Sequence, residues 1–478
     1  MPGYRDVDEQ LVIIGGGAAG LAAVRTARRR DRRVTLVSDG PLGGDCTFTG
    51  CVPSKTLLSG ARSGASFTDA MARVAAVVAW VAAEDDALAR DGGVEVVQGR
   101  GAFVDARTLR VGGASIRSER FVLATGSHPL TPSIPGLVGP SSLTTDRLFE
   151  LDSLPARLVV LGGGPIGVEM AEAFARFGSR VTLLEALPRL LAREEPEASE
   201  VVGAMLTSLG VRVVCDSTCV AVTDAAGTVR LELDDGTTIE CDAVLVAVGR
   251  RASSDGLALE RAGVRLDASG AVVVDARLRT SARHIYACGD VSQTLQFTHV
   301  ADETGRIAAS NALSRVALRR FHPEWTPMVT YTALEVARVG VTERDAPVGA
   351  RVAFLPMSEF DRARMEGEDR GFVKLIAGPR RLTGDLAGGS ILGATIVAPR
   401  AGEMIQEVVL AMRAGLFSAR LAMTTHAYPS WSTAVQLTAA QFFGEFGGRS
   451  ATGRTEGPVS RLRTAARFSH ERGINPLP

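Results

Sequence analysis

A glycine-rich segment that occurs twice restricts the fold of this 478-residue chain more than any other feature of its sequence. Residues 11–17 (LVIIGGG) return 147 residues later as 158–164 (LVVLGGG), and a third glycine and a second apolar segment repeat at the same offset. Each copy reads as a buried strand, a glycine turn, a helix and a second strand, which is a βαβ unit. One Gly-x-Gly-x-x-Gly motif is weak evidence, but two in register over about 28 residues are strong.

The glycines of such a turn have separate physical roles. The first allows a tight turn, the second lets a pyrophosphate approach the backbone, and the third lets the helix pack closely on the strand. The pyrophosphate rests on the helix N-terminus, where N–H groups and the helix dipole favour an anion. The sequence therefore predicts two dinucleotide sites. Their glycines are Gly15, Gly17 and Gly20 in the first copy and Gly162, Gly164 and Gly167 in the second.

The last residue of the second strand distinguishes the two copies. In the second copy it is Glu185, which can accept hydrogen bonds from an adenosine ribose and so favours NADH over NADPH. No arginine stands at 186–188 to hold a 2′-phosphate, although Arg189 is close in sequence. In the first copy the aligned residue is Ser38 and the next is Asp39, and either is expected to contact the ribose of that cofactor.

Two cysteines follow the first glycine turn, within residues 43–55 (GGDCTFTGCVPSK). Cys46 and Cys51 are both expected at the start of a helix, where the dipole and nearby amides lower a thiol pKa below its free value of ~8.5. Pro53 suits the first turn of that helix. The stretch closely resembles the redox-active disulfide of the FAD-dependent pyridine nucleotide-disulfide oxidoreductases, the family of dihydrolipoamide dehydrogenase, glutathione reductase and mercuric reductase.

The resemblance implies a path for electrons. NADH would reduce FAD at one face of the flavin, and a disulfide between Cys46 and Cys51 would take two electrons at the other face. By this resemblance Cys51 lies next to the flavin and Cys46 faces the substrate. Lys55, one of only two lysines in the chain, would lie near flavin N5 and pair with Glu169, which follows the second glycine turn.

Later segments are similar to the remaining cofactor motifs of the family. Residues 121–127 (FVLATGS) resemble a strand and glycine turn that return over FAD. Residues 280–290 resemble the second FAD motif, whose terminal aspartate binds the ribityl chain, and 296–300 would start a helix that points at the flavin. The residues assigned in this way are Thr125, Gly126, Asp290 and Thr298 for FAD, and Gly249 for NAD.

The resemblance implies an α/β fold with two Rossmann-like domains and a C-terminal α+β dimerisation domain, hence a homodimer. The FAD domain is expected to be discontinuous and the NAD(P) domain to be inserted in it. The expected boundaries are 1–148 with 272–322 for the FAD domain, 149–271 for the NAD(P) domain, 323–446 for the dimerisation domain, and 447–478 for a flexible tail without function.

Composition excludes several other classes of protein. The 53 basic residues balance 53 acidic ones, so nothing global attracts nucleic acid or an anionic membrane. The apolar run at 74–83 has half of the ~20 residues that span a bilayer, and the acidic start does not read as a secretory signal. Six cysteines without a dense framework fit a reducing compartment, so we expect a cytoplasmic protein.

The sequence departs from the family near its C-terminus. Disulfide reductases of the family carry a His-Pro-x-x-x-Glu element whose histidine protonates the leaving thiol. In residues 425–433 (THAYPSWST) the histidine position holds Tyr428 and the glutamate position Thr433. A phenol with a pKa of ~10 is a poor base at pH 7, and loss of such a base costs ~10²–10⁴-fold in rate. His426 is an alternative acid, and Tyr428 is alternatively a packing residue at an interface.

The identity of the electron acceptor stays open. A tyrosine at this place looks like mercuric reductase, but that enzyme also uses a C-terminal cysteine pair, and this chain has no cysteine after Cys288. We expect a small acceptor that needs no thiol protonation, such as a quinone or a metal ion. The alternatives are a dihydrolipoamide dehydrogenase or other disulfide reductase, a mercuric reductase-like enzyme, and a redox sensor without turnover.

The other cysteines are expected to pack rather than to bind a metal. Cys215 and Cys219 lie in an apolar, strand-like segment at 213–222 without a histidine cluster. Cys241 and Cys288 look like small residues of the core. The sequence therefore predicts no resident metal site.

Overall fold

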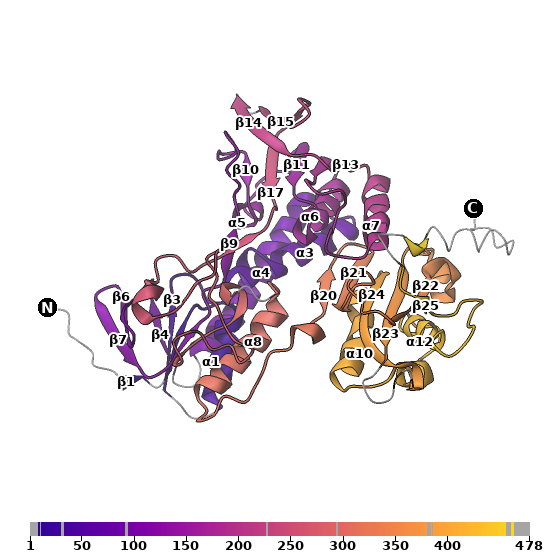
Figure 1. Cartoon of the computed structure of the whole chain (residues 1–478). Helices are drawn as coiled ribbons and strands as arrows, with labels where there is room; N and C mark the ends of the chain where they lie inside the picture. Colours follow the sequence, from indigo (N-terminus) through magenta and orange to yellow (C-terminus); the bar gives the residue numbers. More distant parts are fainter. Residues whose placement is uncertain are drawn as a thin grey trace. The chain divides into compact units, whose positions relative to one another are not determined.

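The computed structural model describes residues 8–9, 11–29, 33–90, 94–225, 228–292, 295–379, 384, 386–455 and 460–462. The chain forms two compact units. The N-terminal unit comprises Met1–Pro155 and Asp242–Pro323, and the C-terminal unit comprises Ala156–Cys241 and Glu324–Pro478. Both units contain helices and strands (Figure 1), which confirms the α/β fold class. The finer division into FAD, NAD(P) and dimerisation domains stays a prediction.

A five-stranded parallel sheet is the centre of the N-terminal unit. Its order is β19-β8-β2-β3-β4. Strands β2 and β8 are continuous apolar runs whose residues are all buried, as expected of a sheet covered on both faces. The five strands are β2 (Leu11–Ile14), β3 (Val34–Ser38), β4 (Val94–Gln98), β8 (Phe121–Leu123) and β19 (Ile285–Ala287).

Two helices of the N-terminal unit, α1 (Ala18–Arg28) and α8 (Thr298–Ala312), pack closely because Gly305 has no side chain. A Cβ atom at Gly305 would overlap the carbonyl oxygen of Ala19. The other helices of this unit are α2 (Gly44–Phe48), α3 (Cys51–Arg62), α4 (Phe67–Arg90) and α5 (Thr145–Leu148), with 3₁₀ turns η1 (Leu259–Ala262) and η2 (Gly289–Ser292).

Three smaller strand groups complete the N-terminal unit. A four-stranded sheet has the order β1-β7-β6-β5. Its strands are β1 (Asp8–Glu9), β5 (Gly101–Asp105), β6 (Thr108–Val111) and β7 (Ala114–Ser118). Two further pairs are β9 (Ser127–Pro129) with β18 (Arg250–Ala252), and β10 (Ser142–Leu143) with β17 (Ala243–Val246).

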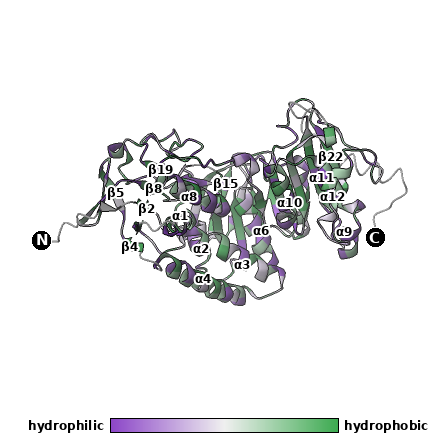
Figure 2. Cartoon of the chain, turned by 90° about the horizontal axis from the view of Figure 1, so that it is seen from below, coloured by the Kyte–Doolittle hydropathy of each residue, from purple (hydrophilic) through white to green (hydrophobic). Residues whose placement is uncertain are grey.

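Helix α4 contains the longest apolar run that the sequence shows outside the glycine repeats. It buries Phe67, Ala70 and Val74, whereas the Trp80 side chain is 64% exposed. Figure 2 shows hydrophilic and hydrophobic residues side by side along this helix. Within the described ranges, no helix is both long and apolar enough to span a bilayer.

The second βαβ unit lies in the C-terminal unit and has the form that the sequence predicts. Strand β11 (Arg157–Leu161), helix α6 (Pro165–Arg176) and strand β12 (Arg180–Leu184) follow one another, and the two strands pair in parallel. Helix α7 (Pro196–Ser208) leads to β13 (Arg212–Val214), which pairs with β12.

The expected single strand at 213–222 is wrong. Strand β13 ends at Val214 and β14 (Cys219–Ala225) begins after a turn in which Asp216 has a φ of 53°. The N–H groups of Asp216 and Ser217 donate to the carbonyls of Leu187 and Glu185. These tertiary hydrogen bonds hold the backbone in a turn and so divide the segment into two strands. Strand β14 forms an antiparallel sheet with β15 (Thr228–Leu233) and β16 (Thr238–Cys241).

A six-stranded antiparallel sheet, ordered β20-β21-β24-β23-β22-β25, forms the rest of the C-terminal unit. Its inner strands and the helices α10 and α12 enclose one apolar core. The strands are β20 (Met328–Thr330), β21 (Glu335–Gly340), β22 (Arg351–Pro356), β23 (Phe372–Gly378), β24 (Ser390–Ala398) and β25 (Thr452–Gly453). The helices are α9 (Asp361–Glu366), α10 (Ala401–Arg413), α11 (Ser418–Met423) and α12 (Thr433–Ala440), with 3₁₀ turns η3 (Pro323–Trp325), η4 (Met357–Glu359) and η5 (Leu386–Gly388).

The C-terminal tail (447–478) takes part in this fold where the structure describes it. Strand β25 adds to the edge strand β22. Residues 456–459 and 463–478 lie outside the described residues, so the flexible tail stays a prediction there.

Candidate active site

The first glycine turn has the shape that a dinucleotide requires. It connects β2 to α1, and a Cβ atom at Gly20 would overlap the carbonyl oxygen of Gly15. A Cβ atom at Gly17 would meet no atom closer than 3.9 Å. The turn is therefore closed where the helix packs on the strand and open where a pyrophosphate would approach. These residues fit the pyrophosphate of FAD.

The second glycine turn repeats this arrangement between β11 and α6. A Cβ atom at Gly167 would overlap the carbonyl oxygen of Gly162, and nothing lies within 4 Å of a Cβ atom at Gly164. These residues fit the pyrophosphate of NAD(P)H in the same way. The assignment of one cofactor to each turn stays a prediction.

The cysteine segment is fastened to the first glycine turn. The N–H of Gly43 donates to the carbonyl of Gly16 over 2.9 Å, and Gly17 and Gly43 form a parallel bridge. Gly44 has a φ of 59°, and a Cβ atom there would lie 2.9 Å from Gly17 Cα. A bulkier residue would therefore push Cys46, two residues on, away from the turn.

The two cysteines lie on consecutive helices. Cys46 is the third residue of α2, and Cys51 is the first residue of α3. The Cys51 sulfur lies 3.1 Å from the Thr298 hydroxyl, which opens α8. The N-termini of α3 and α8 thus meet at this sulfur, where both helix dipoles favour negative charge. The helix that the sequence predicts at Thr298 is confirmed.

The Cys46 thiol has a raised pKa, opposite to the lowering that its position in the sequence suggested. A hydrogen bond with Cys51 is the main cause, and burial raises the pKa of Cys46 further. The two sulfur atoms are so close that the second ionisation is disfavoured. The expectation of two acidic thiols is therefore wrong for Cys46 in the reduced pair.

A polar network surrounds Asp290. Burial raises the pKa of its carboxyl, and the Ser127 hydroxyl donates to it over 2.6 Å. Arg250 donates from Nε to the Ser127 hydroxyl over 2.7 Å and forms an ion pair with Asp45, next to Cys46. The sequence did not single out Arg250 as a site residue, although it directly follows Gly249. No local pattern marks it, because its partners come from three distant segments.

The glycine turn after β8 stays open for a ligand. Thr125 donates its hydroxyl to the carbonyl of Ser253 over 2.7 Å. Nothing lies within 4 Å of a Cβ atom at Gly126, nor of one at Gly249. The proposed contacts of these three residues with cofactors stay predictions.

The residues at the end of the second strand differ between the two βαβ copies. Ser38 is buried and donates to the carbonyl of Gly40 over 2.9 Å, whereas Asp39 is exposed. Glu185 accepts hydrogen bonds from the N–H groups of Gly163 (2.6 Å) and Leu187 (2.8 Å). The Glu185 carboxylate is therefore held beside the second glycine turn.

Comparison with known families decides what these motifs belong to. The chain matches the family described as pyridine nucleotide-disulphide oxidoreductase over residues 9–305. It also matches the dimerisation domain of the same family over 326–439.

The chain belongs to the pyridine nucleotide-disulphide oxidoreductases. It is thus an FAD-dependent oxidoreductase that works with a pyridine nucleotide.

Similar proteins of this family differ in the reactions that their names give. A mercuric reductase from Staphylococcus aureus is 33% identical over 462 residues, covering 92% of this chain and 83% of that protein. A dihydrolipoyl dehydrogenase from Geobacillus stearothermophilus is 32% identical over 458 residues, covering 89% and 94%. The structure of a Cu(II) complex of the HOCl-induced flavoprotein disulfide reductase RclA from Escherichia coli superimposes with a TM-score of 0.83 at 31% identity, covering 91% and 99%.

The residue that the family resemblance pairs with Lys55 has another contact in this oxidoreductase. Glu169 is buried in α6, and one of its carboxylate oxygens accepts the N–H of Tyr331 over 2.8 Å. The neighbouring Glu172 accepts the N–H of Ala333 in the same way. Both carboxylates therefore anchor the turn between β20 and β21. The pairing of Glu169 with Lys55 stays a prediction.

The C-terminal element of this oxidoreductase lacks an available imidazole. Tyr428 is 67% exposed, and its hydroxyl donates to Asp361 over 3.2 Å, which raises the pKa of the phenol. His426 is partly buried, with Nδ1 2.8 Å from the Thr424 carbonyl and Nε2 2.8 Å from Glu407. Both nitrogens of His426 are thus used inside its own chain. Thr433, at the glutamate position, bonds to the carbonyl of Ala427.

The remaining cysteines pack as the sequence predicts. Burial raises the pKa of Cys215 and of Cys219, and raises that of Cys288 to about 12. Cys241 is buried as well. Such thiols are unreactive at neutral pH.

Proposed function

We propose that this oxidoreductase passes electrons from NADH through FAD and the Cys46–Cys51 disulfide to a small acceptor, a metal ion or a quinone. Two features support this most: the raised pKa of the Cys46 thiol, and the phenol of Tyr428 at the position where the family's disulfide reductases have a basic histidine. FAD supplies the two-electron chemistry, because it accepts a hydride from a nicotinamide and gives two electrons to a disulfide.

The roles of the protein residues follow from their positions. Gly15, Gly17 and Gly20 would seat the FAD pyrophosphate, and the carboxylate of Asp290 would bind the ribityl chain. Cleavage of the disulfide by two electrons and one proton leaves one thiol and one thiolate. The raised pKa of Cys46 favours the thiol form there, so the thiolate would be Cys51, beside the Thr298 hydroxyl.

A disulfide substrate would be a poor acceptor for such a pair. Thiol–disulfide exchange needs a thiolate as the attacking group, and Cys46 would have to lose its proton first. Tyr428 cannot take that proton at pH 7, since its own pKa is raised above that of a free phenol. A quinone can accept electrons without this step, and a metal ion can bind to the thiolate that is already present.

The second nucleotide site favours NADH over NADPH. The fixed negative charge of Glu185 beside Gly163 would repel a 2′-phosphate and accept a ribose hydroxyl. Arg189, the nearest candidate for binding that phosphate, is occupied by its own loop. Its guanidinium donates to the hydroxyl of Ser199 and to the carbonyls of Leu191, Ala192 and Glu194.

Two relatives support a metal ion as one candidate acceptor. The mercuric reductase is named for a reaction on mercuric ions, and RclA was solved as a Cu(II) complex. The dimerisation domain supports a homodimer, and a catalytic thiol pair suits the reducing cytoplasm.

An acceptor screen by stopped-flow absorbance tests the proposal. The holoenzyme is reduced with NADH and mixed with lipoamide, oxidised glutathione, a quinone, Hg(II) or Cu(II). We expect reoxidation by a quinone or a metal ion to be at least ~10²-fold faster than by either disulfide, the lower end of the effect of a missing base. Rapid reoxidation by lipoamide or glutathione would contradict it.

The Cys46→Ser variant identifies the route of the electrons. If a metal ion is reduced at the thiol pair, this variant should no longer reduce it. Cys288→Ser serves as the control, since Cys288 is buried. A quinone reaction that survives in Cys46→Ser would show that electrons leave from the flavin directly, and the Cys46–Cys51 route would then be wrong.

A further inference from the structure

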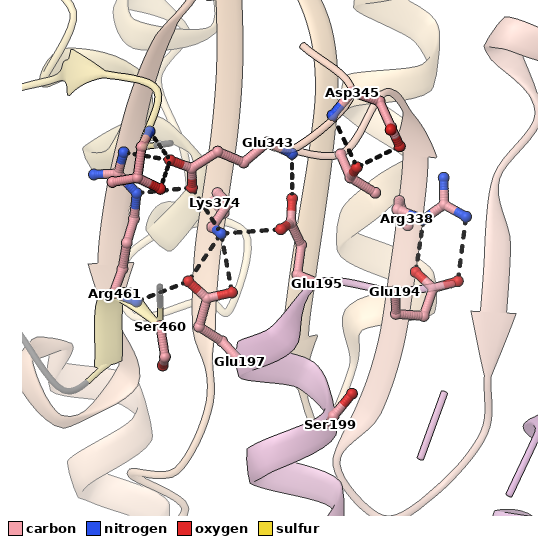
Figure 3. Close-up of polar contacts among 12 residues, drawn as sticks. Glu194, Glu195, Glu197, Ser199, Arg338, Glu343, Asp345, Lys374, Ser460 and Arg461 are labelled. Atoms are coloured by element: carbon pink, nitrogen blue, oxygen red, sulfur yellow. Dashed lines mark hydrogen bonds and ion pairs between the residues drawn. The ribbon is translucent and has the colours of Figure 1, made fainter. Parts of the chain in front are cut away.

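A buried lysine links distant parts of the C-terminal unit. The Lys374 side chain on β23 is 1% exposed, and its Nζ contacts the carboxylates of Glu195 (3.2 Å), Glu197 (2.9 Å) and Glu343 (3.0 Å). Figure 3 shows the ammonium group among these three carboxylates. Glu195 directly precedes α7 and Glu197 lies in its first turn, so both belong to the half of this unit that follows the second glycine turn.

The C-terminal tail closes the cluster. Arg461 donates to both oxygens of Glu343 over 2.6 and 2.8 Å, and its N–H donates to Glu197 over 2.9 Å. Ser460 donates to Glu200, and Thr455 donates to Glu343. The described part of the tail at 452–455 and 460–461 is called the strap below. Figure 3 shows Arg461 on the side of Glu343 away from Glu195.

Charge balance explains why the strap is needed. Three buried carboxylates face one ammonium without Arg461, and buried charge is costly unless it is paired. Burial would raise the pKa of Glu343, but the hydrogen bond from Arg461 and the charge of Lys374 lower it to about 2. Burial raises the pKa of Glu195 in spite of Lys374. Arg461 therefore supplies a positive charge that the cluster otherwise lacks.

The cluster holds the end of a loop that begins at the second nucleotide site. Residues 186–195 connect Glu185 to α7, and the N–H of Leu191 donates to the carbonyl of Gly163 in the glycine turn. Just before the cluster, Glu194 forms a two-pronged ion pair with Arg338 on β21. The loop is thus attached to the glycine turn in its middle and to the C-terminal sheet at its end.

We propose that Lys374 and Arg461 are positioning residues for the second nucleotide site. The strap and the cluster fix the 186–195 loop, and the loop fixes the backbone at Gly163 and the carboxylate of Glu185. This inference rests on the proposed function, in which that site binds NADH. Without Arg461 the loop moves more freely, so NADH binds less tightly, while electron transfer at saturating NADH is unaffected.

Steady-state kinetics of Arg461→Met test the proposal. We expect the KM for NADH to rise about twofold to thirtyfold, the range for residues that couple to a site without touching the ligand, with kcat unchanged. Arg230→Met is the control, because Arg230 pairs with Glu240 at the surface of the same unit. Arg461→Lys, which keeps the charge, should lie between the wild type and Arg461→Met. An unchanged KM with a lowered melting temperature would make Arg461 merely structural and overturn the proposal.

Hydrogen exchange gives a second readout that does not depend on NADH. In Arg461→Lys, and in Arg461→Met if it folds, peptides covering 186–195 should exchange faster than in the wild type, while β11 is unchanged. Equal exchange in the loop would overturn the proposal. Failure of the proposed function is visible separately, because the wild type itself would then show no flavin reduction by NADH.

Discussion

At the scale of single residues, the reactivity of this protein depends on which sulfur of the Cys46–Cys51 pair holds the proton. The sequence places both cysteines near helix N-termini, and from that alone both thiols should be acidic. In the structure, a hydrogen bond with Cys51 and burial raise the pKa of Cys46 instead. A sequence pattern cannot show this, because the result depends on the distance between two side chains on different helices.

The raised pKa predicts how Cys46 reacts with an alkylating reagent. In the reduced enzyme, iodoacetamide should modify Cys46 slowly at pH 7, and the rate should rise as pH passes ~8.5, since only the thiolate reacts. Replacing the partner in Cys51→Ser removes the main cause of the shift, so Cys46 should react faster at pH 7. Peptide mass spectrometry measures both rates. A rate for Cys46 that is constant between pH 6 and 9 would contradict the raised pKa.

Tyr428 is the second residue whose identity directs the chemistry. Substitution Tyr428→His places an imidazole where the family's disulfide reductases have their acid and base, and it should raise lipoamide reduction by up to ~10²-fold. Adding Thr433→Glu should raise it further, because a carboxylate orients the imidazole. Tyr428→Phe should leave the rates with metal ions and quinones unchanged. If the wild type already reduces lipoamide as fast as Tyr428→His, the missing base is not limiting.

At the scale of elements, the two βαβ units were predictable because their signals are local. Apolar strands, glycine spacing and helix length all lie within about 28 residues in each copy, and the structure confirms β2–α1–β3 and β11–α6–β12. The prediction of one strand at 213–222 was wrong because the strand is interrupted by hydrogen bonds to the carbonyls of Glu185 and Leu187. Local patterns predict an element well only where tertiary hydrogen bonds do not interrupt it.

The repeated glycine turn gives a matched pair of substitutions. Gly20→Ala puts a Cβ atom into the carbonyl of Gly15, and Gly167→Ala does the same at Gly162. Gly20→Ala should therefore yield protein that has lost most of its FAD. Gly167→Ala should retain FAD but bind NADH weakly. Absorbance spectra give the FAD content, and the KM for NADH gives the second effect. Loss of FAD in Gly167→Ala, with Gly20→Ala unaffected, would reverse the assignment of the two turns.

At the scale of the whole molecule, the family resemblance predicted the α/β class and the dimerisation domain, and both are confirmed. The Lys374 cluster was not predicted. Its members Glu197, Glu343 and Arg461 lie more than a hundred residues apart, and no periodicity connects them. The tail was expected to have no function, and only the structure shows its contacts with α7.

The expected homodimer can be tested on exposed apolar side chains of the C-terminal unit. Leu410 on α10 and Met423 at the end of α11 are 67% and 77% exposed, and large apolar side chains at such exposure often mark an interface. The wild type should have twice the mass of the chain by size exclusion with light scattering. Leu410→Arg with Met423→Arg should shift it toward the monomer. The control Val316→Arg, at an exposed position of the N-terminal unit, should stay dimeric. A monomeric wild type would contradict the expectation.

Thiol labelling during reduction by NADH shows directly whether electrons reach the Cys46–Cys51 pair. Oxidised holoenzyme is treated anaerobically with one equivalent of NADH, quenched in denaturant with an alkylating reagent, and compared by mass spectrometry with a sample that received no NADH. We expect Cys46 and Cys51 to become labelled together only after NADH, while Cys288 is labelled equally in both samples. A flavin that is bleached by NADH while Cys46 and Cys51 gain no label would contradict it.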